Sequence, residues 1–282
     1  TDIVYDGEPN GTERHSNMIS AYHSTGNIAS VHWSLLYHTI STANTIIDRL
    51  PVSEVSEEQK TIAEAKARFF RGFAYRTLTY LYGGVPLLLT EVIEPKFDYV
   101  RASKEEVLRQ ALTDVEFAAA HLPSLSSVQD GEVSNAAAYH LLSELYLATA
   151  QYQKAVDAAT TVIDDPATGL MYTRFGSRAN ELPGDVYWDL FRKNNQNRSS
   201  GNTEGIWVIQ IETDTPGGSG SLTAKDQTYT LERHHAPMVR DVKAHGMNPF
   251  SWPIGDYTGG RGIGWAISTR YFSDEIWKDD FY

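Results

Sequence analysis

The sequence predicts a mainly α-helical protein built from tetratricopeptide-like helical repeats, with a long irregular region rich in loops and a few short strands. Two observations carry this prediction. Between residues 28 and 164, apolar residues recur at helical spacing, and capping residues, prolines and glycines stand at the expected ends of each segment. Between residues 214 and 264, nine glycines interrupt the chain together with several prolines and aromatic residues.

Composition excludes several classes of protein. Hydrophobic residues make up 41% of the 282 residues, which is a globular value and excludes a wholly disordered chain. A net charge of -12 argues against a general nucleic-acid binder, because an acidic surface repels phosphate backbones. The chain has no cysteine, so disulfides, Cys-ligated zinc, iron–sulfur clusters and thiol nucleophiles are all excluded. No apolar run is long enough to span a bilayer.

Two helices are expected in the first third of the chain. In the first, over residues 28–50, the apolar positions alternate in steps of four and three: Leu36, Ile40, Ala43, Ile47 and Leu50. Pro51 should end this helix. The second begins after Ser53 or Ser56, either of which can cap it, and ends at Tyr82, where a Gly-Gly-Val-Pro run follows.

Three more helices follow an extended segment at residues 84–102. Ser103 and Glu106 have the spacing of a capping box, so a helix should begin there and end near Pro123. The other two are expected at 135–150 and 152–164. Beyond them, a short helix is expected at 185–193, a strand over 206–212 from alternating apolar residues, and a final helix from about residue 269.

The pair of helices at 135–164 fits the tetratricopeptide pattern. It reads Tyr139-x2-Leu142-Ser143-x2-Tyr146, then Ala155-x3-Ala159, then Pro166. The small residues allow two antiparallel helices to approach closely. A second copy is split, its front half near Phe70 being separated from its back half near Ala111 by the insertion at 84–102. The alternative is an unrelated helical hairpin.

Three segments resemble the SusD/RagB family, the surface glycan-binding lipoproteins of Bacteroides-type bacteria. The first is Trp33-x3-Tyr37-x2-Ile40-x2-Ala43-Asn44. The second is the run ARFFRGFAYRTLTYLYGGVPLL at residues 67–88, and the third is EGIWVIQ at 204–210. The resemblance covers residues 28–212 well and 261–282 loosely.

The chain also departs from the family pattern. Lys66 stands where the family usually has Glu, and Phe70 and Gly72 replace the usual Leu and Ala. The family's lipidated Cys and its first strand and helix are absent, and the final segment stops before its usual arginine. We therefore expect a fragment, truncated at both ends.

The resemblance implies a function. It predicts a non-catalytic, surface-exposed lipoprotein of the outer membrane that binds oligosaccharide or polysaccharide and delivers it to a SusC-like TonB-dependent transporter. The only membrane attachment would be an N-terminal lipid anchor that this chain lacks. We expect one SusD-like domain over residues 1–282, with a helical scaffold at 28–212, a loop-rich ligand platform at 213–268 and the start of a further helix at 269–282.

Exposed aromatic residues on loops are the expected sugar contacts, because an aromatic ring stacks on the apolar C–H face of a saccharide while polar groups bind its hydroxyls. The candidate ligand-binding residues are Trp252, Tyr257, Trp265, Asn248, Asp256, Arg261 and Tyr22. Each aromatic could instead simply anchor its loop.

Other polar residues are assigned structural roles. Arg68, Arg71 and Tyr75 share one helix face and should form packing contacts and ion pairs, with Glu64 or Glu144 as candidate partners. Asn44 should hydrogen-bond a neighbouring helix or loop. No catalytic residue, cofactor or metal site is predicted. Asp185 and Asp189 could form a carboxylate pair, but a solvated helix face is the preferred interpretation, and His234, His235 and His245 indicate a metal only weakly. The functional alternatives are a tetratricopeptide-type adaptor for a protein or peptide and, less favoured, a glycoside hydrolase.

Overall fold

The computed structural model describes residues 4–6, 27–210, 242–247, 249, 264 and 266–276. The chain divides into two compact units, one of which is Trp33–Gln210 and the other the remainder of the chain. None of the helices among the described residues combines the length and the apolar character that a membrane span requires.

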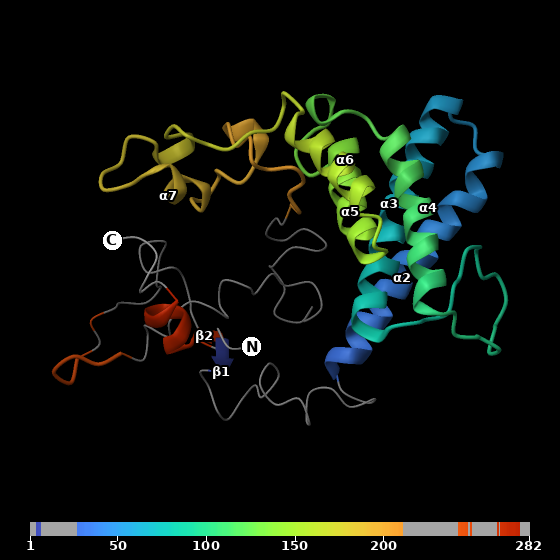
Figure 1. The fold of residues 1–282 in the computed structure, drawn as a ribbon, viewed down its shortest axis with the longest axis horizontal. Coiled ribbons are helices and arrows are strands. Elements are labelled where there is room, and N and C mark those ends of the chain that lie inside the picture. The colour runs from blue at the N-terminus through green and yellow to red at the C-terminus, as the bar shows by residue number, and fades with distance from the viewer. Residues whose placement is uncertain are drawn as a thin grey trace. The chain divides into compact units, whose positions relative to one another are not determined.

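The larger unit is a stack of five long helices (Figure 1). They are α2 (Asn27–Arg49), α3 (Glu57–Tyr82), α4 (Lys104–His121), α5 (Asn135–Ala148) and α6 (Tyr152–Ile163). From α3 onward each helix packs against the next one along the chain. This arrangement confirms the predicted mainly α, tetratricopeptide-like fold.

Side-chain caps fix where these helices begin. Ser56, rather than Ser53, starts α3, where it forms a capping box with Gln59. Ser103 and Glu106 form the predicted capping box of α4, and Ser134 caps α5 by accepting a hydrogen bond from a backbone N–H of its first turn. Each cap supplies a partner for backbone groups that the first turn of a helix leaves unpaired.

Small residues allow α3 and α4 to approach closely in the centre of the core. A Cβ atom built on Gly72 of α3 would lie 2.5 Å from Cγ2 of Val115 and 3.1 Å from the carbonyl oxygen of Ala111, both on α4. The surrounding core is apolar, with Ile40, Phe69 and Leu78 almost fully buried. The absence of a side chain at Gly72 therefore allows the two helices to lie close together.

The segment between α3 and α4 is irregular and lies against α2 and α3. Gly83 ends α3 with a φ of 73°, a conformation that glycine adopts without strain. Pro86 and Arg101 form an isolated antiparallel bridge, so the two ends of the segment lie side by side. The Tyr37 hydroxyl of α2 donates to the carbonyl of Pro86 at 2.8 Å, which ties the segment to the first helix.

Short turns rather than long elements form residues 164–210. They include the short helix α7 (Val186–Leu190) and two 3-10 turns, Gly176–Arg178 and Arg198–Ser200; similar turns, Leu50–Val52 and Leu125–Ser127, follow α2 and α4. The strand predicted over 206–212 is wrong for residues 206–210, which pair with no neighbouring strand. Consecutive residues Ile206 and Trp207 both pack against the helical core, so the alternation in sequence does not separate two faces.

The described part of the other unit contains the start of α2, one short sheet, an isolated bridge between Ala244 and Met247, and one helical turn. Strands β1 (Val4–Asp6) and β2 (Ala266–Ser268) pair antiparallel, with Val4 opposite Ser268. The helix expected from residue 269 is a five-residue π-helix, Tyr271–Glu275, within the described residues.

Candidate ligand-binding site

All seven sequence-predicted ligand residues lie outside the described residues: Tyr22, Asn248, Trp252, Asp256, Tyr257, Arg261 and Trp265. They remain predictions. The described chain instead shows how the family-like segments form the scaffold and which aromatic side chains that scaffold exposes.

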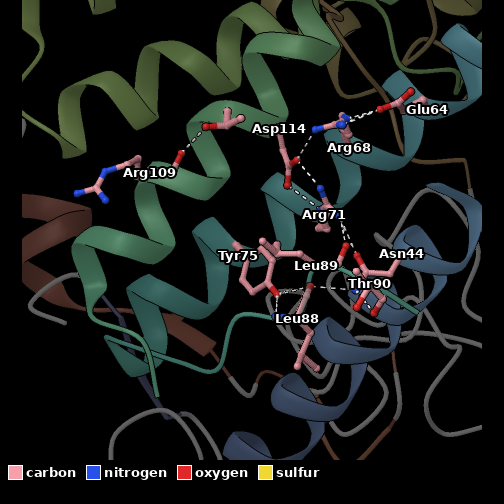
Figure 2. Close-up of polar contacts among 11 residues, drawn as sticks. Asn44, Glu64, Arg68, Arg71, Tyr75, Leu88, Leu89, Thr90, Arg109 and Asp114 are labelled. Carbon is pink, nitrogen blue, oxygen red and sulfur yellow. Dashed lines mark hydrogen bonds and ion pairs between the residues drawn. The ribbon is translucent and has the colours of Figure 1, made fainter. Parts of the chain in front are cut away.

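A buried polar cluster joins α2, α3 and α4 at the centre of the scaffold (Figure 2). We call it the Arg71 cluster; it comprises Arg71, Asp114, Asn44 and Tyr75. Arg71 donates from Nε to Oδ2 of Asp114 at 2.8 Å and from Nη2 to Oδ1 at 2.7 Å. Its Nη1 donates to Oδ1 of Asn44 at 2.7 Å and to the carbonyl of Leu89 at 3.2 Å. The charged fork is therefore fully paired in a buried site, as a buried charge requires.

The same cluster holds the backbone that follows the Gly-Gly-Val-Pro turn. Asn44 donates to the carbonyls of Leu88 at 2.9 Å and Thr90 at 3.2 Å. The Tyr75 hydroxyl donates to the carbonyl of Leu88 at 2.8 Å and accepts from its N–H at 2.7 Å. Burial raises the pKa of Tyr75 to about 12. The prediction that Asn44 bonds a neighbouring loop is thus confirmed.

The ion pairs of α3 are partly those predicted. Arg68 pairs with Glu64 at 2.7 Å as expected and also lies 3.3 Å from Asp114. Glu144 pairs with Arg76 instead of the residues considered from the sequence. The partner of Arg71 is Asp114, which the sequence indicates only by its place on the apolar face of α4 with Ala111 and Val115.

Trp207 closes the side of the scaffold next to α3. Its ring meets Phe69, Phe70 and Phe73 edge-on, at centroid distances of 5.6, 5.9 and 6.4 Å. Its Nε1 donates to the carbonyl of Gly131 at 3.1 Å, and a small hollow beside it is lined in part by Val128 and Arg198. Trp207 therefore anchors the EGIWVIQ segment to the helices.

A second ion pair, between the partly exposed Arg174 and the buried Asp189, organises residues 172–195, which we call the α7 segment. Arg174 donates from Nε to Oδ2 of Asp189 at 2.5 Å and from Nη2 to Oδ1 at 3.1 Å. It also donates to three backbone carbonyls, those of Arg178, Glu181 and Gly184. The hydrogen bond from Arg174 is the main reason why the pKa of Asp189 lies below its ordinary value.

The expectation of a solvated helix face is wrong for Asp189, whereas Asp185 is exposed as expected. Asp189 is fully buried, because α7 turns it toward Arg174, and Asp185 caps α7 by accepting from the N–H of Trp188 at 2.8 Å. Both carboxylates therefore have structural partners.

Asn195 completes the α7 segment from its far end. Its Nδ2 donates to the carbonyls of Asp189 at 2.9 Å and Phe175 at 3.3 Å, and its Oδ1 accepts from the N–H of Ser177 at 3.0 Å. A Cβ atom on Gly176, which has a φ of 74°, would lie 2.1 Å from Oδ1 of Asn195, so the position accepts only glycine. The two ends of the segment are thus joined by buried side-chain bonds.

The organised α7 segment exposes aromatic rings. Tyr187 and Phe191 are 68% and 66% exposed, and their ring centroids lie 5.0 Å apart. Trp188 is half-buried and lies against two guanidinium groups, that of Arg174 at 5.6 Å and that of Arg192 at 4.4 Å from its centroid.

No group of three or more potential metal-ligating side chains occurs within the described residues. Of the three histidines considered, only His245 lies in this part of the chain, exposed in a turn with a φ of 51°. His234 and His235 lie outside it.

Comparisons with known proteins agree with this scaffold. A family model described as SusD-like, starch-binding and associating with the outer membrane matches residues 9–147. "SusD-like protein P2" of Formosa agariphila is 29% identical over 142 residues, which is 50% of this chain and 28% of that protein.

Solved structures share the fold. A SusD-like protein from Bacteroides fragilis aligns with a TM-score of 0.58 at 21% identity, covering 72% of this chain and 39% of its own. A SusD-like carbohydrate binding protein from the same species aligns with a TM-score of 0.60 at 19% identity, covering 91% of this chain and 48% of its own. The chain therefore spans less than half the length of these relatives. The matched segment contains the Arg71 cluster and the helices that it joins, and over this segment the chain is similar to SusD-like proteins.

Proposed function

We propose that this chain is part of a non-catalytic cell-surface protein that binds glycans and delivers oligosaccharides to a SusC-like TonB-dependent transporter. One observation carries the proposal: the family match over residues 9–147 coincides with the scaffold that the Arg71 cluster holds together. The family description, starch-binding and associating with the outer membrane, supports both the ligand class and a location at the outer membrane. Attachment would be through an N-terminal lipid anchor.

The physical basis of the proposal is a rigid scaffold that carries irregular segments. The Arg71 cluster and the packed helices fix the backbone, while sugar contacts require exposed rings that such a backbone can hold in place. Trp252, Tyr257 and Trp265 are the proposed stacking residues. The polar contacts with the hydroxyls are assigned to Asn248, Asp256, Arg261 and Tyr22.

The proposal does not include bond cleavage. A glycosidase needs two carboxylates held at a defined separation across the scissile bond. The one pair that the sequence suggested, Asp185 and Asp189, is engaged in a helix cap and an ion pair. Incubation with a glycan panel followed by a reducing-sugar assay tests this point directly, since release of reducing ends would identify a hydrolase.

Affinity electrophoresis in gels containing starch tests the proposed function. The wild-type chain should be retarded relative to a gel without polysaccharide, and Trp252→Ala should reduce the retardation. Phe97→Ala is the matched control, because Phe97 is an almost fully exposed ring on the 84–102 segment, outside the proposed platform. Failure of the wild type to bind starch or any neutral glycan, combined with capture of a peptide or protein partner, would instead support the adaptor alternative.

A further inference from the structure

The α7 segment presents a surface whose side chains have the chemistry of a second ligand site. Tyr187 and Trp188 lie on α7, and Phe191 and Arg192 lie in the turn that follows it. The ring of Tyr187 meets that of Phe191, and the ring of Trp188 meets the guanidinium of Arg192. The side chains of Tyr187 and Phe191 are both about two-thirds exposed. Exposed aromatic side chains that pack on each other rather than on the core leave ring faces and edges available to a partner.

This surface is held in a fixed conformation. Asp189, on the opposite side of α7, is fully buried and receives hydrogen bonds from Arg174 and from the N–H of Phe175. The Nδ2 of Asn195 donates to the carbonyl of Asp189 in the last turn of the helix. A short helix fixed at both ends presents its outward side chains with little conformational freedom to lose on binding, which favours recognition.

The charge of the α7 segment is opposite to that of the whole chain. Residues 172–195 contain four Lys and Arg and three Asp and Glu, so 4 − 3 = +1, in a chain whose net charge is -12. Arg174 is paired with Asp189. In the described part of the chain, Arg192 and Lys193 form no ion pair, and the Nε of Arg192 is buried without a hydrogen-bond acceptor.

We propose that the surface formed by Tyr187, Trp188, Phe191 and Arg192 binds an acidic saccharide, one that carries carboxylate or sulfate groups. The rings of Tyr187 and Phe191 contact the apolar C–H faces of the sugar. Trp188 supports the guanidinium of Arg192, whose planar fork matches the geometry of a carboxylate or sulfate. This inference rests on the proposed function only in that the ligand is a glycan; it uses none of the residues assigned to the 213–268 platform.

The experiment measures affinities of the full chain for three probes: alginate, a polyuronate; carrageenan, a sulfated polysaccharide; and starch, which is uncharged. We expect two variants to bind the acidic probe that the wild type binds: the double variant Tyr187→Ala/Phe191→Ala and the single variant Arg192→Gln. Each should bind it about tenfold more weakly than the wild type, which corresponds to ~1.4 kcal/mol of binding free energy. Their affinity for starch should equal that of the wild type. If the wild type binds alginate but not carrageenan, the recognised group is a carboxylate; if it binds carrageenan but not alginate, the group is a sulfate.

Two controls separate this inference from the proposed function. Tyr152→Ala removes a ring of similar exposure on α6 and should change no affinity. Trp252→Ala should weaken starch binding and leave α7-dependent acidic binding unchanged. If the wild type binds starch but neither acidic probe, or if the α7 variants bind acidic probes normally, the inference is overturned and the proposed function stands. If the α7 variants weaken binding of an acidic probe while the wild type binds no neutral glycan, the assignment of residues 213–268 as a ligand platform is wrong and the inference stands.

Discussion

Arg71 of α3 and Asp114 of α4 form a two-pronged ion pair at the centre of the helical scaffold, with 3% and 0% of their surfaces exposed. A buried pair of charges stabilises a fold little compared with apolar residues of similar size, but the loss of one partner leaves the other charge unpaired in the core. The pair therefore specifies how α3, α4 and the 84–102 segment fit together.

Arg71→Ala should destabilise the protein by about 3–5 kcal/mol, because buried Asp114 loses its two-pronged partner and the Oδ1 of Asn44 loses its donor. Chemical denaturation measures the change. Arg68→Ala is the matched control: Arg68 also approaches Asp114, but it is partly exposed, and its loss should cost about 1 kcal/mol or less. Normal stability of Arg71→Ala together with loss of glycan binding would contradict the structural role of the cluster.

Gly72→Ala tests the close approach of α3 and α4. The new methyl group would lie 2.5 Å from Val115 and 3.1 Å from a backbone carbonyl that cannot move aside easily, so we expect a loss of about 1–3 kcal/mol. Gly169→Ala serves as the reference, because its Cβ would have 4.0 Å to the nearest side-chain atom. A melting temperature equal to that of the wild type for Gly72→Ala would show that the helices can separate without cost.

Helices and their ends could be predicted from sequence because their determinants are local. The capping box of Ser103 and Glu106 and the cap at Ser134 depend on residues within one turn, and both occur where expected. The resemblance to the SusD/RagB family supplied the overall fold, because residues 67–88 correspond to one helix and the turn that follows it.

Long-range partners could not be predicted in the same way. Asp114 lies 43 positions from Arg71 in the sequence, and the chain contains many other carboxylates that could pair with Arg71. Asp189 was expected to face solvent because helical spacing places residues on a face but does not say which face the rest of the chain covers. The predicted strand is wrong over residues 206–210 for a related reason: Trp207 packs against the aromatic face of α3 rather than lying in a strand.

Stability should fall at alkaline pH as buried tyrosines ionise. Burial raises the pKa of Tyr75 to about 12, above the ordinary value of 10.0 that applies when the chain is unfolded. Because the unfolded chain releases this proton first, the contribution is complete below pH 10 and is lost as pH rises to 12, by about 2–3 kcal/mol at most. Urea denaturation across this interval checks the slope.

Tyr75→Phe provides the comparison for the alkaline loss. It removes the titrating hydroxyl and both of its hydrogen bonds to Leu88, so it should be less stable at neutral pH but lose less stability between pH 10 and 12. Tyr37 and Tyr146 have pKa values that burial also raises, so the variant should retain part of the slope. An unchanged slope would show that Tyr75 does not contribute.

Trp252→Ala should weaken glycan binding while leaving the melting temperature nearly unchanged, since a ring that stacks on ligand is exposed in the free protein. Parallel thermal melts and affinity electrophoresis give both quantities. A large drop in melting temperature would identify Trp252 as a core residue and remove it from the proposed platform.

Asp189→Asn should loosen the α7 segment without unfolding the helical scaffold. The substitution keeps the size of the side chain but leaves the guanidinium of Arg174 without its charged partner, and that guanidinium also holds the carbonyls of Arg178, Glu181 and Gly184. Limited proteolysis should therefore cut faster within residues 172–195, while α2–α6 stay intact. Asp185→Ala removes only the cap of α7, which should cost about 1 kcal/mol of stability. The protease should therefore cut this variant more slowly than Asp189→Asn. If both variants are cut at the wild-type rate, Asn195 and the surrounding contacts hold the segment without the ion pair, and Arg174 is not its organising residue.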